Sequence, residues 1–134
     1  MAQRTLLLDT NILLCAVISP EKLSAELQAQ LTNSENDIYF SAASIWEIAI
    51  KASLNKADFN FSPEDIQALA LQTGFTELPM QSAHTFAVAA LPWHHHDPFD
   101  RLLIAQALAL PAYLVTSDVQ LKTYSELVQV VSLK

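Results

Sequence analysis

With 134 residues, of which 51% are apolar and 16% charged, the chain has the composition of one globular domain and not of a disordered segment. Its 14 acidic and 7 basic residues give a formal net charge of −7, which argues against a broad basic surface for nucleic acid. The single cysteine excludes an internal disulfide framework and no apolar run reaches the roughly 18 residues of a membrane span, so we expect a cytoplasmic protein without a membrane partner.

Short apolar runs alternate with helical patterns along the chain. Apolar runs without a helical period predict strands at 4–9, 36–42 and 112–118 and, more weakly, at 75–80 and 128–133. Helical patterns cover 20–32, 43–54, 63–73, 81–90, 98–109 and, briefly, 119–124. This alternation predicts an α/β fold with a mostly parallel sheet and helices on both of its faces.

Ligands in such sheets bind beyond the carboxyl ends of the strands, so the residues at these ends are candidates for a site. The single glycine, Gly74, excludes the glycine-rich loops that cradle phosphates. Acidic residues close an expected strand or open the helix that follows one, and we expect them to meet at one edge of the sheet. They are Asp9, Glu47, Asp97, Asp100 and Asp118.

Each of these acids also has a structural interpretation as a helix cap or a first-turn residue. Asp9 would cap a helix starting at Asn11 or Ile12, and Asp97 and Asp118 would cap the helices that follow them. The stretch SIWE, residues 44–47, fits a capping box, and its glutamate stands four residues before Lys51, as in a surface ion pair.

The apolar sequences around the acids favour burial, which makes their convergence costly. Two carboxylates ~4 Å apart repel by about 4 kcal/mol at an effective dielectric constant near 20. We therefore expect the pocket either to take up protons or to bind a hard divalent cation. An all-oxygen ligand set favours Mg²⁺ or Mn²⁺ over zinc.

The histidines and tryptophans are interpreted separately. His94, His95 and His96 are consecutive and cannot share one helix face, so we expect a positive or proton-carrying rim beside the acids and no zinc site. His84 stands alone in a helical pattern and is interpreted as structural. Trp46 and Trp93 are expected to be core or dimer contacts and not base-stacking platforms.

Four segments in order resemble the PIN domain, and specifically the VapC-type toxins of type II toxin–antitoxin pairs. The segments are LLLDTNILL (6–14), SAASIWEIAIK (41–51), HDPFDRLLIAQAL (96–108) and LVTSD (114–118). The resemblance implies a single PIN domain over residues 1–134, built as a Rossmann-like α/β/α sandwich with about five strands. It also implies an Mg²⁺-dependent endoribonuclease, with Mn²⁺ as a substitute, that forms a homodimer and is silenced by a cognate, VapB-like antitoxin.

The resemblance also assigns roles to residues of this chain. Asp9, Glu47, Asp100 and Asp118 correspond to the acidic quartet that binds the metal and hydrolyses RNA phosphodiester bonds through a metal-activated water. Asn11, Asp97, Thr116 and Ser117 are accessory candidates. The candidate RNA contacts are Lys51, Arg101, His95 and His96.

Other classes remain open at this point. An aspartyl-phosphate phosphatase of the haloacid dehalogenase type would have a second acid two residues after Asp9, where this chain has Asn11. A phospho-receiver module would have adjacent acids after the first strand, which the chain lacks. A catalytically silent PIN-like scaffold that binds RNA or protein is the third alternative, and the RNA target cannot be read from the residues.

Overall fold

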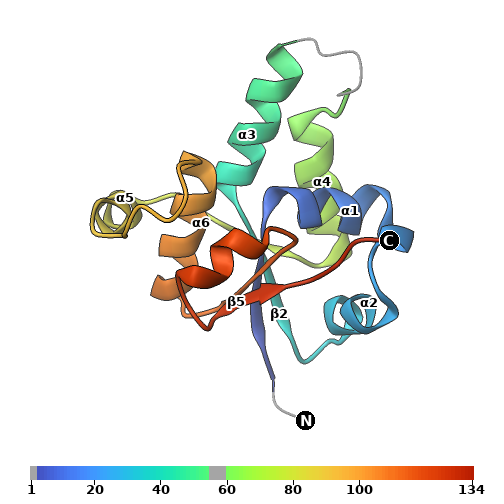
Figure 1. Ribbon diagram of the computed structural model, residues 1–134. Helices are drawn as coiled ribbons and strands as arrows, with labels where there is room; N and C mark the ends of the chain where they lie inside the picture. The colour runs from blue at the N-terminus through green and yellow to red at the C-terminus, as the bar shows by residue number, and fades with distance from the viewer. Residues whose placement is uncertain (1–2, 55–59) are drawn as a thin grey trace.

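The computed structural model describes residues 3–54 and 60–134, which form a three-layer α/β/α sandwich (Figure 1). Its sheet has five parallel strands in the order β3-β2-β1-β4-β5. The strands are β1 (Thr5–Leu8), β2 (Asp37–Ser41), β3 (Thr76–Leu78), β4 (Tyr113–Thr116) and β5 (Val128–Val130). The predicted α/β class and the parallel sheet are therefore confirmed.

Six α-helices and two 3-10 helices connect the strands within the described residues. The α-helices are α1 (Thr10–Ile18), α2 (Ala25–Thr32), α3 (Ala42–Ser53), α4 (Pro63–Thr73), α5 (Ser82–Ala89) and α6 (Pro98–Ala109), and the 3-10 helices are η1 (Pro20–Lys22) and η2 (Val119–Thr123). None of these helices is long and apolar enough to cross a membrane.

Strand β1 is the centre of the sheet and is buried on both faces. It pairs with β2 through Leu6 and Ile38 and with β4 through Leu7 and Leu114. Leu6 and Leu8 face a core formed with α1, α2, α3 and α4, whereas Leu7 faces a second core formed with α6 and η2. Because successive side chains of a strand point to opposite faces, a continuous leucine run suits a strand covered on both sides.

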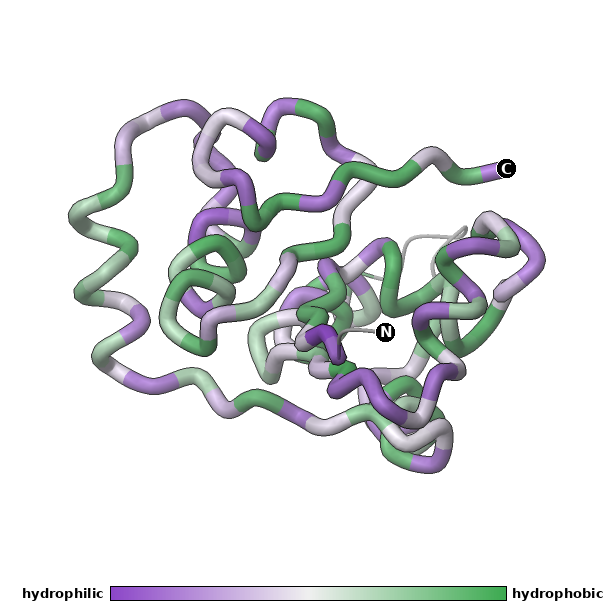
Figure 2. The backbone as a smooth tube through the Cα atoms, turned by 90° about the horizontal axis from the view of Figure 1, so that it is seen from below, coloured by the Kyte–Doolittle hydropathy of each residue, from purple (hydrophilic) through white to green (hydrophobic). Residues whose placement is uncertain are grey.

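Helix α5 is the outermost element on the α6 side of the sheet, and Figure 2 shows it along the outer edge of the molecule. It packs against α6 through His84, which is buried and close to Gln106 of α6. The Nδ1 atom of His84 accepts a hydrogen bond from the backbone N–H of Gln81, which begins the helix. The structural interpretation of this histidine is thereby supported.

Two local predictions are wrong, and a third is narrowed. The single helix over 20–32 divides into η1 and α2, because the Ser24 hydroxyl accepts a bond from Leu27 N–H and starts a new helix. Helix α3 begins directly after β2, with the Ser41 hydroxyl bonded to Ala43 N–H, so the stretch SIWE lies inside the helix and forms no capping box. Trp46 is 53% and Trp93 70% exposed, so of the two predicted roles, core residue or dimer contact, the structure excludes the first and the second stays a prediction.

Candidate metal centre

Asp9 connects the central strand to α1 and lies at the carboxyl end of the sheet. Its Oδ1 accepts a hydrogen bond of 2.8 Å from the backbone N–H of Ile12, which makes it the N-cap of α1. Its Oδ2 accepts a bond of 2.5 Å from the hydroxyl of Thr116, at the end of the adjacent strand β4. The side chain is therefore held at both oxygens while the residue is only 6% exposed.

Burial raises the pKa of Asp9 from its ordinary value of 3.8 to about 6. The hydrogen bonds from Thr116 and Ile12 oppose this shift because they stabilise the carboxylate, and the negative charges of Glu47 and Asp118 add to it. Asp9 thus caps a helix, but its ionised form is unfavourable because the carboxylate is buried. A capping aspartate in contact with solvent would not have this penalty.

Asp100 lies in the first turn of α6, beside the carboxyl end of β1. The pKa of its carboxyl is raised from 3.8 to about 7, mainly by desolvation and also by the negative charges of Asp97 and Asp9, while His95 opposes the shift. Asp9 and Asp100, whose negative charges are both poorly stabilised, are close enough for the charge of Asp9 to raise the pKa of Asp100. The site therefore favours either protons or a cation, as the sequence predicted.

Glu47 reaches the same place from the middle of α3. Its Oε1 accepts a hydrogen bond of 2.6 Å from the Thr10 hydroxyl, and Ser44 Oγ lies 2.9 Å from the same hydroxyl. Its Oε2 lies 3.3 Å from Lys51 Nζ, which confirms the predicted ion pair. Thr10 and Ser44 are not among the site residues predicted from the sequence, although Thr10 follows Asp9 directly and Ser44 stands three residues before Glu47.

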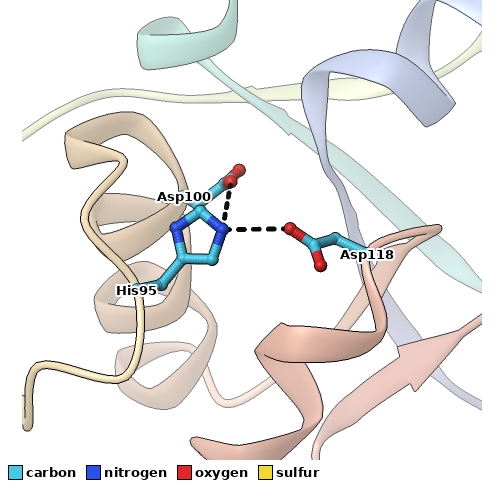
Figure 3. A group of neighbouring side chains, drawn as sticks. All are labelled: His95, Asp100 and Asp118. Atoms are coloured by element: carbon cyan, nitrogen blue, oxygen red, sulfur yellow. Dashed lines mark hydrogen bonds and ion pairs between the residues drawn. The ribbon is translucent and has the colours of Figure 1, made fainter.

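Asp118 follows β4 and caps η2 through a bond of 2.9 Å from Gln120 N–H to its Oδ1. Figure 3 shows its Oδ2 facing the imidazole of His95, 3.0 Å from Nε2. The same Nε2 lies 3.8 Å from Asp100 Oδ2. One potential ligand atom from each of these three residues lies within 4.8 Å of the others.

The acids described above surround one pocket of about 240 Å³ at the carboxyl edge of the sheet. All four acids of the predicted quartet line it, as do the accessory candidates Asn11, Asp97 and Ser117. The complete lining is Asp9, Thr10, Asn11, Leu14, Glu47, Lys51, Asp97, Asp100, Ser117 and Asp118. Carboxylate and hydroxyl oxygens dominate this set, and together with the raised pKa values they fit a hard divalent cation such as Mg²⁺ or Mn²⁺.

Asp97 lines the pocket and Thr116 lies behind it, and both side chains support its acids. Asp97 Oδ1 accepts from Phe99 N–H at 2.8 Å and from Asp100 N–H at 3.4 Å, so it caps α6 as predicted. Thr116 is fully buried behind Asp9 and also accepts a bond of 3.1 Å from Asp118 N–H. It therefore links the first and last acids of the quartet.

The candidate RNA contacts differ in their placement. Lys51 and His96 lie on an open groove that adjoins the pocket and has Ile50, Leu54 and Phe99 in its apolar wall. Arg101, in contrast, is only 3% exposed, and its guanidinium donates to backbone carbonyls and stacks on the Trp93 ring. Arg101 is consequently not among the residues that we propose to contact RNA.

The fold and the site define a class of protein: an α/β/α sandwich in which four acids from separate segments converge at the carboxyl edge of the sheet, in a pocket whose oxygen atoms suit a divalent cation. Residues 6–127 match the model of the PIN domain, and the chain belongs to the PIN domain family. PIN domains are generally nucleases, and PIN nucleases generally depend on a divalent metal. Comparison with curated protein sequences gives no significant match.

Solved structures share the fold over almost the whole chain. VapBC2 from Rickettsia felis, bound to a DNA fragment from its promoter, aligns with a TM-score of 0.69 and 18% identity over 97% of this chain and 99% of that chain. VapBC-1 from nontypeable Haemophilus influenzae aligns with a TM-score of 0.60 and 22% identity over 90% and 91%. FitAcB from Neisseria gonorrhoeae aligns with a TM-score of 0.59 and 19% identity over 89% and 91%.

Proposed function

We propose that this protein is an Mg²⁺-dependent endoribonuclease that acts as the toxin of a type II toxin–antitoxin pair. The observation that supports the proposal most directly is the convergence of Asp9, Glu47, Asp100 and Asp118 around one pocket. Two of these acids have strongly raised pKa values, as expected for carboxylates whose natural partner is a cation. The hydrolysis of a phosphodiester is the reaction for which PIN folds generally use such a pocket.

We assign the metal to the oxygen atoms of the quartet. Asp9 and Asp100, whose burial leaves their charge least stabilised, would bind it directly, and Glu47 and Asp118 would bind it directly or through water. When bound, Mg²⁺ or its substitute Mn²⁺ lowers the pKa of a water molecule and stabilises negative charge on the phosphodiester. This assignment also explains how a chain with net charge −7 approaches a polyanion, since the cation supplies the attraction.

The surrounding residues hold the acids in place. The Thr116 hydroxyl fixes Asp9, and the Thr10 hydroxyl fixes Glu47 from the adjacent turn of α1. Lys51 pairs with Glu47 at the rim, and its side chain is 46% exposed, which supports the proposal that its ammonium contacts a substrate phosphate. These contacts preorganise the pocket, so little reorganisation is needed when metal and substrate bind.

The proposed partners are RNA, a second copy of the chain and a VapB-like antitoxin, and the proposed location is the cytoplasm. Structural similarity to toxin–antitoxin complexes supports an antitoxin, although the identities of 18–22% show only a shared fold. Several large apolar side chains of this chain are exposed, and a second copy or an antitoxin could bury them. They include Trp46, Leu54, Phe86 and Trp93.

The proposal is tested with purified protein and labelled, structured RNAs in the presence of Mg²⁺ or EDTA. Asp9→Asn and Asp100→Asn should each lower the single-turnover cleavage rate by more than about 100-fold, since changes even one shell away from a metal cost 10- to 100-fold. Glu35→Gln, which removes an exposed acid far from the pocket, is the matched control and should cleave like the wild type.

The outcomes separate the alternatives. Cleavage that needs Mg²⁺ and is lost in the two variants supports the nuclease. RNA binding without cleavage would favour a silent scaffold, and transfer of labelled phosphate to Asp9 would favour the phosphatase or receiver class. In cells, expression should stop growth only when the neighbouring antitoxin gene is absent.

A further inference from the structure

We propose that His95 is a positioning residue, which orients the carboxylate of Asp118 toward the metal through a hydrogen bond from its Nε2–H group. The inference rests on the proposed function, because it takes Asp118 as part of the metal centre. It assigns to His95 a role different from the phosphate contact that the sequence suggested. This role depends on the position of the imidazole proton, on the exposure of Asp118 and on the rigidity of the segment that contains His95.

The hydrogen bonds of His95 determine which of its nitrogen atoms has the proton. The backbone N–H of Asp97 donates to Nδ1 at 3.1 Å, so Nδ1 uses its lone pair as an acceptor and has no proton. A neutral imidazole with a bare Nδ1 has its proton on Nε2. That atom lies 3.0 Å from Asp118 Oδ2, which is the geometry of an N–H donor to a carboxylate.

The same bonds argue against His95 as a metal ligand, although its Nε2 lies close to Asp100 and Asp118. Ligation through Nε2 would need an unprotonated Nε2 and therefore a proton on Nδ1. A proton on Nδ1 would point at the N–H of Asp97, which would lose its acceptor. The imidazole thus serves the centre as a donor to a carboxylate and leaves the metal to oxygen atoms.

Asp118 is the acid that most needs such a donor. Its side chain is 37% exposed, compared with 21% for Asp100 and 16% for His95. Gln120 N–H restrains only Oδ1, so without His95 the other oxygen, Oδ2, would face solvent with no side-chain donor among the described contacts. A carboxylate held at both oxygens presents its remaining lone pairs to the pocket in one orientation, which lowers the entropy cost of binding a cation.

The segment that contains His95 is anchored well enough to act as a support. The backbone N–H of His95 donates to the hydroxyl of Tyr124 at 2.9 Å, and Arg101 Nη1 donates to the same hydroxyl at 3.2 Å. The guanidinium of Arg101 also bonds the carbonyls of Val88 and Pro92 at 3.0 and 2.9 Å. The backbone at His95 is therefore fixed by Tyr124, the residue that follows η2, and Arg101 of α6 holds the same hydroxyl.

The neighbouring histidines do not share this arrangement and supply a control. His94 and His96 are both exposed, and each ring lies near an aromatic ring: the His94 and Tyr124 centroids are 5.1 Å apart, and the His96 and Trp93 centroids are 5.7 Å apart. Neither ring reaches a carboxylate of the quartet in the described contacts. A change at His94 therefore removes a histidine from the same loop without removing the donor to Asp118.

The test compares five variants: three at His95, His94→Gln and Asp118→Asn. They are compared by their affinity for Mn²⁺, measured by electron paramagnetic resonance of the free ion at constant pH, and by their unfolding in urea. The side chain of glutamine places an amide N–H near the position of Nε2, whereas that of asparagine reaches only as far as Nδ1. We expect His95→Ala and His95→Asn to weaken Mn²⁺ binding by about 10- to 100-fold. His95→Gln should stay within about threefold of the wild type, and His94→Gln should be unchanged.

Each result has a defined meaning. Loss in His95→Ala with rescue in His95→Gln supports the positioning role, because folding alone would not distinguish the two. If His95→Ala binds Mn²⁺ like the wild type while Asp118→Asn binds it weakly, the positioning role is overturned and the metal centre stands. The role is also overturned if His95→Gln is as weak as His95→Ala. If the wild type itself binds no Mn²⁺, both the proposed function and this inference fail.

Discussion

The replacement Asp9→Asn should make the metal-free protein more stable at alkaline pH, although it removes a central residue of the proposed site. Burial raises the pKa of Asp9 from 3.8 to about 6, a difference of roughly 2 units at about 1.4 kcal/mol each. The ionised side chain therefore costs the folded protein about 3 kcal/mol at pH 8. Asparagine has no charge to bury and still accepts from Ile12 N–H through its oxygen.

The gain is smaller than the full penalty because of Thr116. Its hydroxyl donates to Asp9 Oδ2, where asparagine would present an amide N–H, and the imperfect contact should cost about 1 kcal/mol. The net expectation is an increase of about 2 kcal/mol in the free energy of unfolding at pH 8. For a domain of this size that corresponds to a rise in Tm of roughly 8 °C.

The pH dependence gives the sharper test. A carboxyl whose pKa is raised in the folded state stabilises that state fully only below pH 3.8, and this stability is lost as the pH rises through about 6. About half of the penalty in the wild type is already present at pH 5 and all of it at pH 8. The advantage of Asp9→Asn over the wild type should therefore grow by about 1.5 kcal/mol between pH 5 and pH 8.

The assay is urea unfolding in EDTA at a series of pH values, with Glu35→Gln as the control. Removal of this exposed acid should change the free energy of unfolding by less than about 0.5 kcal/mol and without a pH trend. If Asp9→Asn is less stable than the wild type at pH 8, or if its advantage does not change with pH, Asp9 has no desolvated charge and the reasoning is refuted.

Three further predictions use the same pocket and its supports. Mg²⁺ at about 100 times its Kd should raise the free energy of unfolding of the wild type by about 2.7 kcal/mol and leave that of Asp9→Asn unchanged. If urea titrations show the same increase for both proteins, the ion binds at another site. Thr10→Val removes the donor to Glu47 and keeps the shape of the side chain. The rate of RNA cleavage should therefore fall about 10-fold, while the free energy of unfolding changes by no more than about 1 kcal/mol. An unaltered single-turnover rate would contradict the role of Thr10 in holding Glu47. Arg101→Leu leaves the carbonyls of Val88 and Pro92 without their donor and should lower the free energy of unfolding by about 2–4 kcal/mol. A loss below about 1 kcal/mol in thermal and urea unfolding would show that the guanidinium contributes little to holding this segment.

The strands and most helices could be predicted because their patterns are local. A leucine run at 6–8 with no helical period has few alternatives to a strand covered on both faces, and the structure buries all three side chains completely. Asp97 and Pro98 stand in the order typical of a helix start, and α6 begins there. Where two local signals competed, as at Ser41 and Ser44, the choice depended on where β2 ended, which the helical pattern does not reveal.

The acids of the site could also be predicted, but their surroundings could not. Parallel strands have their carboxyl ends at one edge of the sheet, so the position of an acid after a strand is enough to bring it there. Burial, charge and hydrogen-bond partners depend instead on which distant segments pack together. Thr10 meets Glu47 across 37 positions of sequence, and His95 meets Asp118 across 23.

The sequence by itself thus determined the order of strands and helices and the edge at which the acids gather, because hydrophobic periodicity and helix-start residues act over a few neighbouring positions. Only the tertiary structure decided that Asp9 and Asp100 hold an unfavourable charge, that Arg101 is an internal anchor and that His95 faces an acid. Desolvation and hydrogen bonding depend on the distances between atoms that the chain brings together only when it folds.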